Sequence, residues 1–356
     1  MSKSPCEYFS KCGGCDFLDL SEENYRLVKK NILGSNFAEA NWIWVGANSR
    51  RKIILQIGAK NQLGFFAKKS KEIVEIESCF VSESKISELI LPLKNFLKKQ
   101  EQNFFTKVAI TLFDNGLDVV LSGKKELNFL QTQKLFAFGK EQNLNISYLY
   151  KNQDMPIFWP HKNQIFYDNF KIELDSDIFI QSTKSGLNAI FEIIKNFIEE
   201  KISNDPKFSS KSIVADIYAG FGAYSFGISH LVKKITAFEG DEKMVALINK
   251  NAAANNLGNK ISAEKKDLFL NPIRAKELKN FDLIIINPPR NGAAPQILEI
   301  AKSVIKNLIY VSCNPQTFAH DAKILVDSGF KIKNLFALDQ FYSTKHLELI
   351  SVFEKK

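Results

Sequence analysis

A cysteine near the C-terminal end of the sequence stands where it could act as a nucleophile. The apolar run Asn307-Leu-Ile-Tyr-Val ends on Ser312-Cys313-Asn314-Pro315. The run predicts a buried strand, and Asn-Pro ends regular structure because the residue before a proline disfavours helix. Ligands of an open α/β sheet collect outside the carboxyl ends of its strands, so we expect Cys313 to face a pocket. A lone cysteine is more often structural, and the rest of the sequence must decide between the two roles.

The other four cysteines could together serve as the ligands of a metal site. Three lie in one short N-terminal stretch, at Cys6, Cys12 and Cys15, and Cys79 follows a strand-like segment. Four thiolates can hold a [4Fe-4S] cluster or a zinc ion. Zinc ligands come more often as two paired knuckles, so three cysteines plus one distant cysteine favour iron and sulfur, with zinc and unligated thiols as alternatives. Either metal would stabilise a small domain with little core of its own.

A glycine-rich turn and an acidic residue predict a nucleoside cofactor. The turn Ile217-Tyr-Ala-Gly220-Phe-Gly222 follows a predicted strand, and the next predicted strand ends at Glu239. Glycines let the backbone approach a ligand closely, and an acid at the end of the second strand can accept both ribose hydroxyls. The turn lacks the third glycine of a dinucleotide fingerprint, which favours S-adenosylmethionine over NAD.

A third strand end adds an amide next to the cysteine. The predicted strand 281–287 ends at Asn287-Pro-Pro-Arg290, and its carboxyl end should neighbour Cys313 on the sheet. Asn-Pro-Pro followed by an aromatic residue is a signature of enzymes that methylate exocyclic nitrogen. Arg290 stands at the aromatic position, and this departure, together with Cys313, weakens the amino-methylation alternative.

The elements that position these residues predict an α/β protein with three parts. Helices over 184–201 and 242–256 alternate with apolar strands, as in a Rossmann-like class I methyltransferase domain. Residues 49–76 predict successive antiparallel strands, followed by a helix over 84–100 and strands over 107–113 and 117–122, whereas 124–180 carry few signals. We therefore expect an iron-sulfur-binding N-terminal segment with β-strands (1–80), a small β-rich central RNA-binding domain (81–175) and a methyltransferase domain (176–356).

Composition predicts a cytoplasmic protein with a polyanionic partner. The 356 residues exceed the usual length of a domain with a single hydrophobic core, and 45% of them are hydrophobic. We find neither a signal peptide nor an apolar run long enough to span a membrane. The net charge of +9 favours a polyanionic partner without naming it, with an ordinary lysine-rich surface as an equal alternative. Basic residues that cluster beside Phe65 and Phe66 suit single-stranded RNA, or else form a solvated face: Arg50, Arg51, Lys52, Lys68, Lys69 and Lys71.

Taken together, these motifs resemble a known family. It is the class I, S-adenosylmethionine-dependent RNA (uracil-5)-methyltransferases, in particular the iron-sulfur branch that methylates 23S rRNA. The resemblance spans nearly the whole chain, and its most specific pair is Ser312-Cys-Asn-Pro with the later His346-Leu-Glu348. It also covers the cysteine array, Gly64-Phe-Phe, Phe179-Ile-Gln181, Asp216-Ile-Tyr-Ala-Gly-Phe-Gly, Glu239-Gly-Asp241 and Asn287-Pro-Pro-Arg.

The resemblance implies a role for each of these residues. Cys313 would add as a thiolate to carbon 6 of the target uracil and make carbon 5 nucleophilic toward the methyl group, and Glu348 would remove the carbon-5 proton. A carboxylate is a weak base unless it is desolvated, so we expect a raised pKa for Glu348. The target base would have to flip out of the RNA. The four remaining cysteines would hold a [4Fe-4S] cluster, and the cofactor contacts would be Gln181, Tyr218, Gly220, Gly222, Glu239, Asp267 and Asn287.

The chain departs from the family pattern at a few positions. Asn287 replaces a common Asp, Ala219 a common cysteine, and Ala223 a hydroxyl or amide, which would weaken cofactor affinity. The cysteine array and the absence of a preceding TRAM domain favour the 23S rRNA branch, and we expect a monomer. A tRNA uracil-5 methyltransferase is the alternative within the family, and a non-catalytic iron-sulfur RNA-binding protein is the alternative outside it. His346 could orient Glu348.

Overall fold

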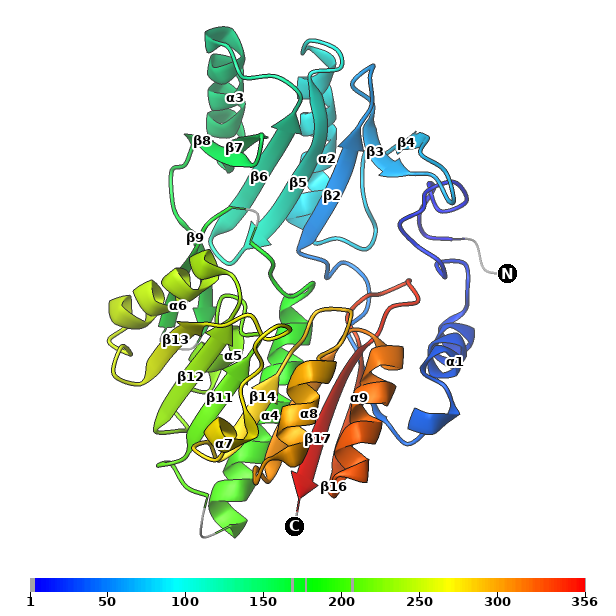
Figure 1. Ribbon diagram of the computed structural model, residues 1–356. Helices are drawn as coiled ribbons and strands as arrows, with labels where there is room; N and C mark the ends of the chain where they lie inside the picture. Colours follow the sequence, from blue (N-terminus) through cyan, green and yellow to red (C-terminus); the bar gives the residue numbers. More distant parts are fainter. Residues whose placement is uncertain (1–3, 168–169, 177, 206–207, 356) are drawn as a thin grey trace.

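Two large β-sheets with helices packed on them make up the protein. The computed structural model describes residues 4–167, 170–176, 178–205 and 208–355. Figure 1 shows a seven-stranded sheet in its upper half and an eight-stranded sheet in its lower half. None of the described helices combines the length and the apolar composition needed to cross a membrane.

The eight-stranded sheet is parallel except for one strand. Its order is β1 (Asn41–Trp44), β16 (Phe330–Asp339), β17 (Glu348–Lys355), β15 (Asn307–Ser312), β14 (Leu283–Ile286), β11 (Ile213–Ile217), β12 (Lys234–Glu239) and β13 (Ile261–Lys265). β17 runs antiparallel to both of its neighbours. The chain winds outward from β11 in both directions, so β11 and β14 form the switch point outside which ligands of such sheets bind.

Helices cover both faces of this sheet. Figure 1 shows α8 (Ala294–Lys302) and α9 (Pro315–Asp327) in front of it and α4 (Lys184–Asn204) behind it. Strand β14 is buried along its whole length, with Ile285 in the core on the α4 side and Ile284 in the core under α8 and α9. Burial on both faces explains why β14 and β15 are apolar runs rather than alternating patterns. The remaining helices of this part are α1 (Glu22–Leu33), the 3₁₀ helix η1 (Ser35–Phe37), α5 (Ala223–Gly227), α6 (Glu242–Ala254) and α7 (Ala275–Leu278).

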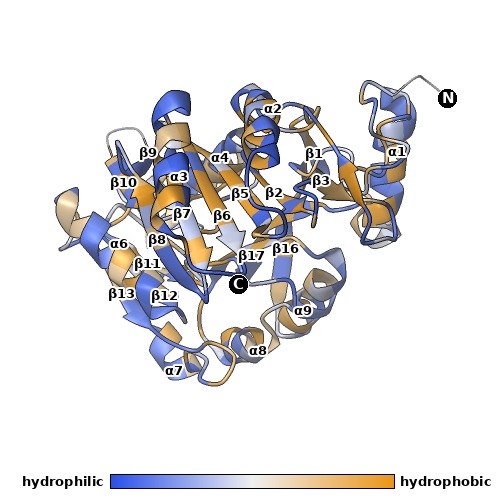
Figure 2. Ribbon diagram, turned by 90° about the horizontal axis from the view of Figure 1, so that it is seen from above, coloured by the Kyte–Doolittle hydropathy of each residue, from blue (hydrophilic) through white to orange (hydrophobic). Residues whose placement is uncertain are grey.

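The seven-stranded sheet is antiparallel except where β6 pairs with β7. Its order is β4 (Ile73–Glu75), β3 (Leu63–Phe66), β2 (Lys52–Ile57), β5 (Phe105–Phe113), β6 (Gly116–Gly123), β7 (Asn145–Tyr150) and β8 (Gln153–Phe158). Helices α2 (Ser84–Lys98) and α3 (Phe129–Gln142) pack on it around a separate core. Coloured by hydropathy, β5 and β6 are largely orange, which fits strands that bury a face under these helices (Figure 2). A two-stranded ribbon of β9 (Asn163–Tyr167) and β10 (Phe170–Leu174) follows.

Several elements lie where the sequence predicts them. Helix α2 begins at Ser84 as expected, α4 begins at Lys184, and β15 ends immediately before Cys313. Residues 124–180 contain α3 and β7 to β10, which weak alternation did not indicate. The expected N-terminal range 1–80, whose residues 1–3 lie outside the described residues, contributes to both sheets, because β1 pairs with β16 while β2 to β4 join the other sheet.

Candidate active site and cysteine pocket

Cys313 and Glu348 leave neighbouring strands at the same edge of the sheet. β15 and β17 are antiparallel, and Ser312 pairs with Leu349 at the carboxyl end of β15. Cys313 follows Ser312 directly and Glu348 precedes Leu349 directly, so the two side chains start from adjacent positions. The Cys313 residue is half-buried, whereas Glu348 is only 3% exposed. Cys313 is thus the more accessible of the two residues, while Glu348 stays out of water.

Burial governs the chemistry of Glu348. The pKa of its carboxyl is raised to about 7. Desolvation raises this pKa, and a hydrogen bond from Gln340 and the charge of Arg290 partly offset the rise. Gln340 donates from Nε2 to Oε2 of Glu348 over 2.8 Å. A carboxylate whose pKa lies near neutrality is a far better base than an exposed one. The environment therefore supplies what proton removal from carbon requires.

Arg290, in the loop after β14, affects the pKa of the Cys313 thiol. Burial and the Glu348 carboxylate raise the pKa of the Cys313 thiol, whereas the charge of Arg290 and a hydrogen bond with it lower that pKa. Asn314 holds the loop in place, since its Nδ2 donates to the Arg290 carbonyl over 3.0 Å. The sequence drew attention to Arg290 as a departure from the amino-methylation motif and as part of the family resemblance, but not as a partner of the thiol. Its position beside the thiol is decided by the pairing of β14 with β15.

The turn after β11 has the backbone geometry of a ligand cradle. Tyr218, Gly220 and Gly222 all have positive φ, at 61°, 57° and 83°. A Cβ added at Gly220 would meet no atom within 4 Å, so the backbone there faces open space. Asp216, which is fully buried with a pKa raised by burial to about 6, accepts hydrogen bonds from both N and Oγ of Ser225. These bonds fix α5 against the strand and so hold the turn.

Glu239 lies across this turn, at the end of β12. Its Oε2 accepts from the Gly220 N–H over 2.9 Å, and its Oε1 accepts from the N–H groups of Gly240 and Asp241. Asp267 instead accepts from the N–H groups of Phe269 and Leu270, and this turn brings the Phe269 ring within 5.6 Å of the Tyr218 ring. The predicted cofactor residues on β12 and after β13 thus border the same turn.

Two of the predicted cofactor residues, Tyr218 and Gln181, carry buried polar atoms that have no partner within the described part of the chain. Neither Tyr218 OH nor Gln181 Nε2 has a hydrogen-bond partner among the described residues. Asn287 has one, since its Nδ2 donates to Tyr224 OH over 3.3 Å. Buried polar groups are normally satisfied, so a polar ligand at these two residues would supply the missing partners. Tyr224, whose pKa is raised by burial and by Glu348, connects the cofactor side with the base, and no sequence signal pointed to it.

The four N-terminal cysteines line one pocket. Cys6, Cys12, Cys15 and Cys79 surround it together with apolar side chains such as Phe65. Burial raises the pKa of Cys6, of Cys12 and, to about 12, of Cys15, and neighbouring thiols add to each shift. Thiols so crowded need a cation to become thiolates together. Within the described part of the chain, no three His, Cys, Asp or Glu side chains are placed to hold a single metal ion.

The basic group beside Phe65 does not form one surface. Arg51 is only 2% exposed and donates from Nε to the Gln181 carbonyl over 2.9 Å, and Lys52 donates to the Ile178 carbonyl. Lys68 lies 4.1 Å from the ring of Phe9, and Arg50 lines the cysteine pocket. The hypothesis of an RNA-binding face is therefore wrong for Arg51, because this side chain is buried and its hydrogen bond goes to the backbone of Gln181, a predicted cofactor residue.

Comparisons with known proteins agree on a family and a fold. Residues 58–356 match the family model described as tRNA (uracil-5-)-methyltransferase. The chain is 29% identical to the 23S rRNA (uracil(1939)-C(5))-methyltransferase RlmD of Shewanella woodyi, over 98% of this chain and 81% of that protein. It is 27% identical to an uncharacterized RNA methyltransferase of Mesorhizobium japonicum, over 98% and 84% of the two chains. The crystal structure of Pyrococcus abyssi tRNA (uracil-54, C5)-methyltransferase in complex with S-adenosyl-L-homocysteine shares its fold, with a TM-score of 0.74, 22% identity and coverage of 96% and 86%.

Proposed function

Because this chain belongs to the tRNA (uracil-5-)-methyltransferase family, we propose that it methylates carbon 5 of one specific uridine in 23S rRNA, with Cys313 as nucleophile and Glu348 as general base. The chain is an RNA (uracil-5)-methyltransferase; the substrate RNA and the residue roles are the proposal. The single observation that carries it is the pairing of Ser312 with Leu349, which starts Cys313 and Glu348 from adjacent positions at one sheet edge.

The proposed reaction begins and ends at the Cys313 sulfur. Its thiolate adds to carbon 6 of the uracil, and the electron pair of the 5,6 double bond makes carbon 5 nucleophilic. S-adenosylmethionine, when bound, supplies the methyl group that carbon 5 takes up. Glu348 then removes the proton from carbon 5, the double bond re-forms, and the sulfur leaves carbon 6 as a thiolate. Arg290 favours the reactive thiolate, because its charge lowers the pKa of Cys313.

The residues around the β11 turn fit S-adenosylmethionine. Tyr218 OH and Gln181 Nε2 are buried polar groups without partners in the described chain, and the open space over Gly220 leaves room for a ligand against the backbone. Glu239 is held by three N–H groups with its carboxylate at the strand end, where it can accept from ribose hydroxyls. We assign cofactor binding to these residues and to Gly222, Asp267 and Asn287.

The cysteine pocket supports a [4Fe-4S] cluster as part of the proposal. Its four thiols come from two distant segments and converge on one apolar pocket. A cluster spreads four thiolates over four iron atoms, whereas zinc needs all its sulfur ligands about 2.3 Å from one ion. Three cysteines in one segment and a fourth far along the chain favour the cluster over paired zinc knuckles. Cys6, Cys12, Cys15 and Cys79 would hold it, and it would tie the N-terminal segment to the seven-stranded sheet.

Ribosomal RNA is favoured over tRNA by the cysteine array and by the RlmD relative of Shewanella woodyi, whose name states a 23S rRNA uracil as its target. The family description names tRNA instead, so a tRNA substrate is the competing proposal. The net charge of +9 suits either polyanion. A base of a folded RNA must leave its stack before Cys313 can reach it.

Nucleoside mass spectrometry of rRNA and tRNA from cells that lack the gene tests this proposal. We expect 5-methyluridine to disappear from one fragment of 23S rRNA and to return with the wild-type gene but not with Cys313→Ala. Loss from tRNA alone would overturn the rRNA substrate and keep the chemistry. A fully active Cys313→Ala protein would contradict the covalent mechanism and favour amino methylation, and no loss from either RNA would favour a binding protein.

A further inference from the structure

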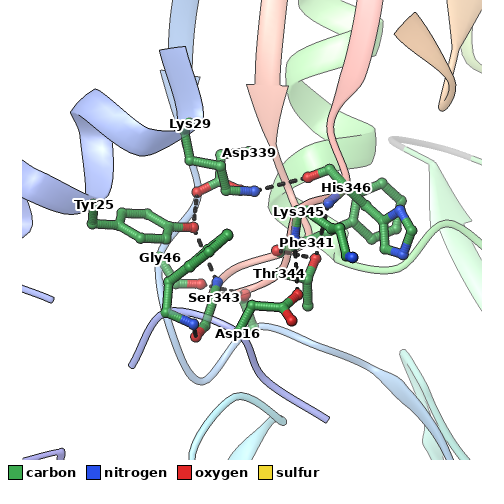
Figure 3. Close-up of polar contacts among 12 residues, drawn as sticks. Asp16, Tyr25, Lys29, Gly46, Asp339, Phe341, Ser343, Thr344, Lys345 and His346 are labelled. Atoms are coloured by element: carbon green, nitrogen blue, oxygen red, sulfur yellow. Dashed lines mark hydrogen bonds and ion pairs between the residues drawn. The ribbon is translucent and has the colours of Figure 1, made fainter. Parts of the chain in front are cut away.

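A buried lysine from the N-terminal helix lies beside the connection that leads to Glu348. Lys29 of α1 is fully buried, and its Nζ lies 2.7 Å from Oδ1 of Asp339. The same ammonium group donates to the carbonyl oxygen of His346 over 2.8 Å (Figure 3). Asp339 is the last residue of β16, and His346 lies just before β17. One charged group therefore joins both ends of the connection 340–347.

A second contact from α1 holds the middle of that connection. Tyr25 OH donates to Oδ2 of Asp339 and accepts from the N–H of Ser343 over 3.0 Å (Figure 3). From the segment before α1, the N–H of Asp16 donates to the Ser343 carbonyl over 2.6 Å, and Oδ2 of Asp16 accepts from the N–H of Lys345 over 3.2 Å. The connection is thus fixed at its ends and at its centre by residues of the N-terminal segment.

Stability alone does not explain a buried ion pair. The desolvation of two charges offsets most of their attraction, and apolar residues of similar volume would hold α1 at least as well. An ammonium group that contacts two oxygen atoms holds both of them close to one buried point. Here the ammonium group forms an ion pair with the Asp339 carboxylate, immediately before Gln340, and donates a hydrogen bond to the His346 carbonyl, shortly before Glu348.

The two ends of the connection lie next to Gln340 and Glu348, whose side chains are hydrogen-bonded to each other. Gln340 follows Asp339, is 1% exposed, and donates from Nε2 to Oε2 of Glu348 over 2.8 Å. We propose that Lys29 is a positioning residue for Glu348, because its ammonium group joins the two ends of the connection that sets Gln340 against the carboxylate. The inference rests on the proposed role of Glu348 as the general base.

The test separates the two chemical steps in one turnover. Full-length enzyme with its metal is mixed with S-adenosylmethionine and a 23S rRNA transcript, and methyl incorporation and the covalent enzyme–RNA complex on denaturing gels are followed over time. The variant is Lys29→Met combined with Asp339→Asn, which leaves no unpaired charge in the core. Tyr25→Phe is a milder second variant. Lys201→Met is the matched control, because it removes an ion pair to Glu354 at the other end of β17.

We expect methyl incorporation in the Lys29 variant to stay within about twofold of wild type, because Cys313 is untouched. Breakdown of the covalent complex should slow about tenfold. A catalytic group misplaced by about 1 Å can cost a hundredfold in rate, and we expect Glu348 to shift by less than that. Tyr25→Phe should show a smaller delay of the same step. Equal loss in both steps, as an unstable protein gives, or unchanged breakdown, would overturn the positioning role. Glu348→Gln is measured in parallel. If this variant accumulates no covalent complex, the assignment of Glu348 as base fails, and this inference fails with it. If Glu348→Gln accumulates the complex but the Lys29 variant does not, only the role of Lys29 is refuted.

Discussion

Gln340 donates a hydrogen bond from Nε2 to Oε2 of Glu348 over 2.8 Å, and both side chains are buried. This amide is the neutral partner of a carboxyl group whose pKa burial raises to about 7. Among the described residues, Arg290, Cys313 and Tyr224 are titratable groups on other elements that interact with Glu348. The pKa of Glu348 therefore lies between that of an unpartnered buried carboxyl, which would stay protonated, and that of an exposed one, which would be a weak base.

The breakdown of the covalent enzyme–RNA complex should depend on pH. Glu348 must be deprotonated to accept the carbon-5 proton, so the rate should rise with pH through about 7 and level off above it. Quenched single-turnover reactions between pH 5.5 and about 9 would measure this profile. A profile that is flat across neutrality would contradict Glu348 as the base.

Replacement of Gln340 should shift that profile. Gln340→Met removes a donor that favours the charged carboxylate, so the pKa of Glu348 should rise further and the rate at pH 7 should fall about threefold to tenfold. The matched control is Gln296→Met, because Gln296 is also buried but bonds the backbone of Ile273. An equal shift in both variants would mean that the effect is general destabilisation.

Replacement of Arg290 should slow the first step instead. Arg290 lowers the pKa of Cys313, so Arg290→Met should leave fewer thiolates and slow formation of the covalent complex by about tenfold near neutral pH. Alkylation of Cys313 by iodoacetamide against pH would report the thiol pKa directly. Arg274→Met is the control, since Arg274 is an exposed partner of Glu299 in the same part of the chain. Unchanged alkylation in Arg290→Met would refute the electrostatic role.

Glu239 should matter for the cofactor and not for RNA. Glu239→Gln removes the charge that would accept ribose hydroxyls, and loss of one or two charge-assisted hydrogen bonds predicts a Kd for S-adenosylmethionine that is about tenfold to a hundredfold higher. Isothermal titration measures it. Glu242→Gln serves as control, because Glu242 is an exposed partner of Lys265 nearby in the chain. If both variants bind the cofactor like wild type, Glu239 does not hold the ribose.

The cysteine pocket and the nucleophile should be separable. Cys79→Ser should lose bound iron and the brown absorbance of a cluster, and should unfold at a lower temperature because the tie between two segments is gone. Cys313→Ser should keep the iron and lose methylation. Iron and sulfide analysis of anaerobically purified protein decides the matter. Zinc in place of iron under those conditions would contradict the cluster.

Local patterns were enough to predict the residues that stand at strand ends. Cys313 and the Gly220 turn follow an apolar strand and Glu239 is the last residue of one, and in the structure all three lie at the carboxyl edge of the eight-stranded sheet. The helices over α2 and α4 were equally visible, because their apolar periodicity is strong. Between 124 and 180 the strands are short and their alternation weak, so the sequence did not indicate them.

The sequence by itself determined which side chains could carry out the chemistry, because reactive types at strand ends are a local property. The tertiary structure alone decided what surrounds them. Lys29 meets His346 across 317 positions of the chain, and Arg51 meets Gln181 across 130. Such partners share no local pattern. Burial, which raises the pKa of Glu348 and turns Arg51 away from solvent, exists only once the distant segments have packed together.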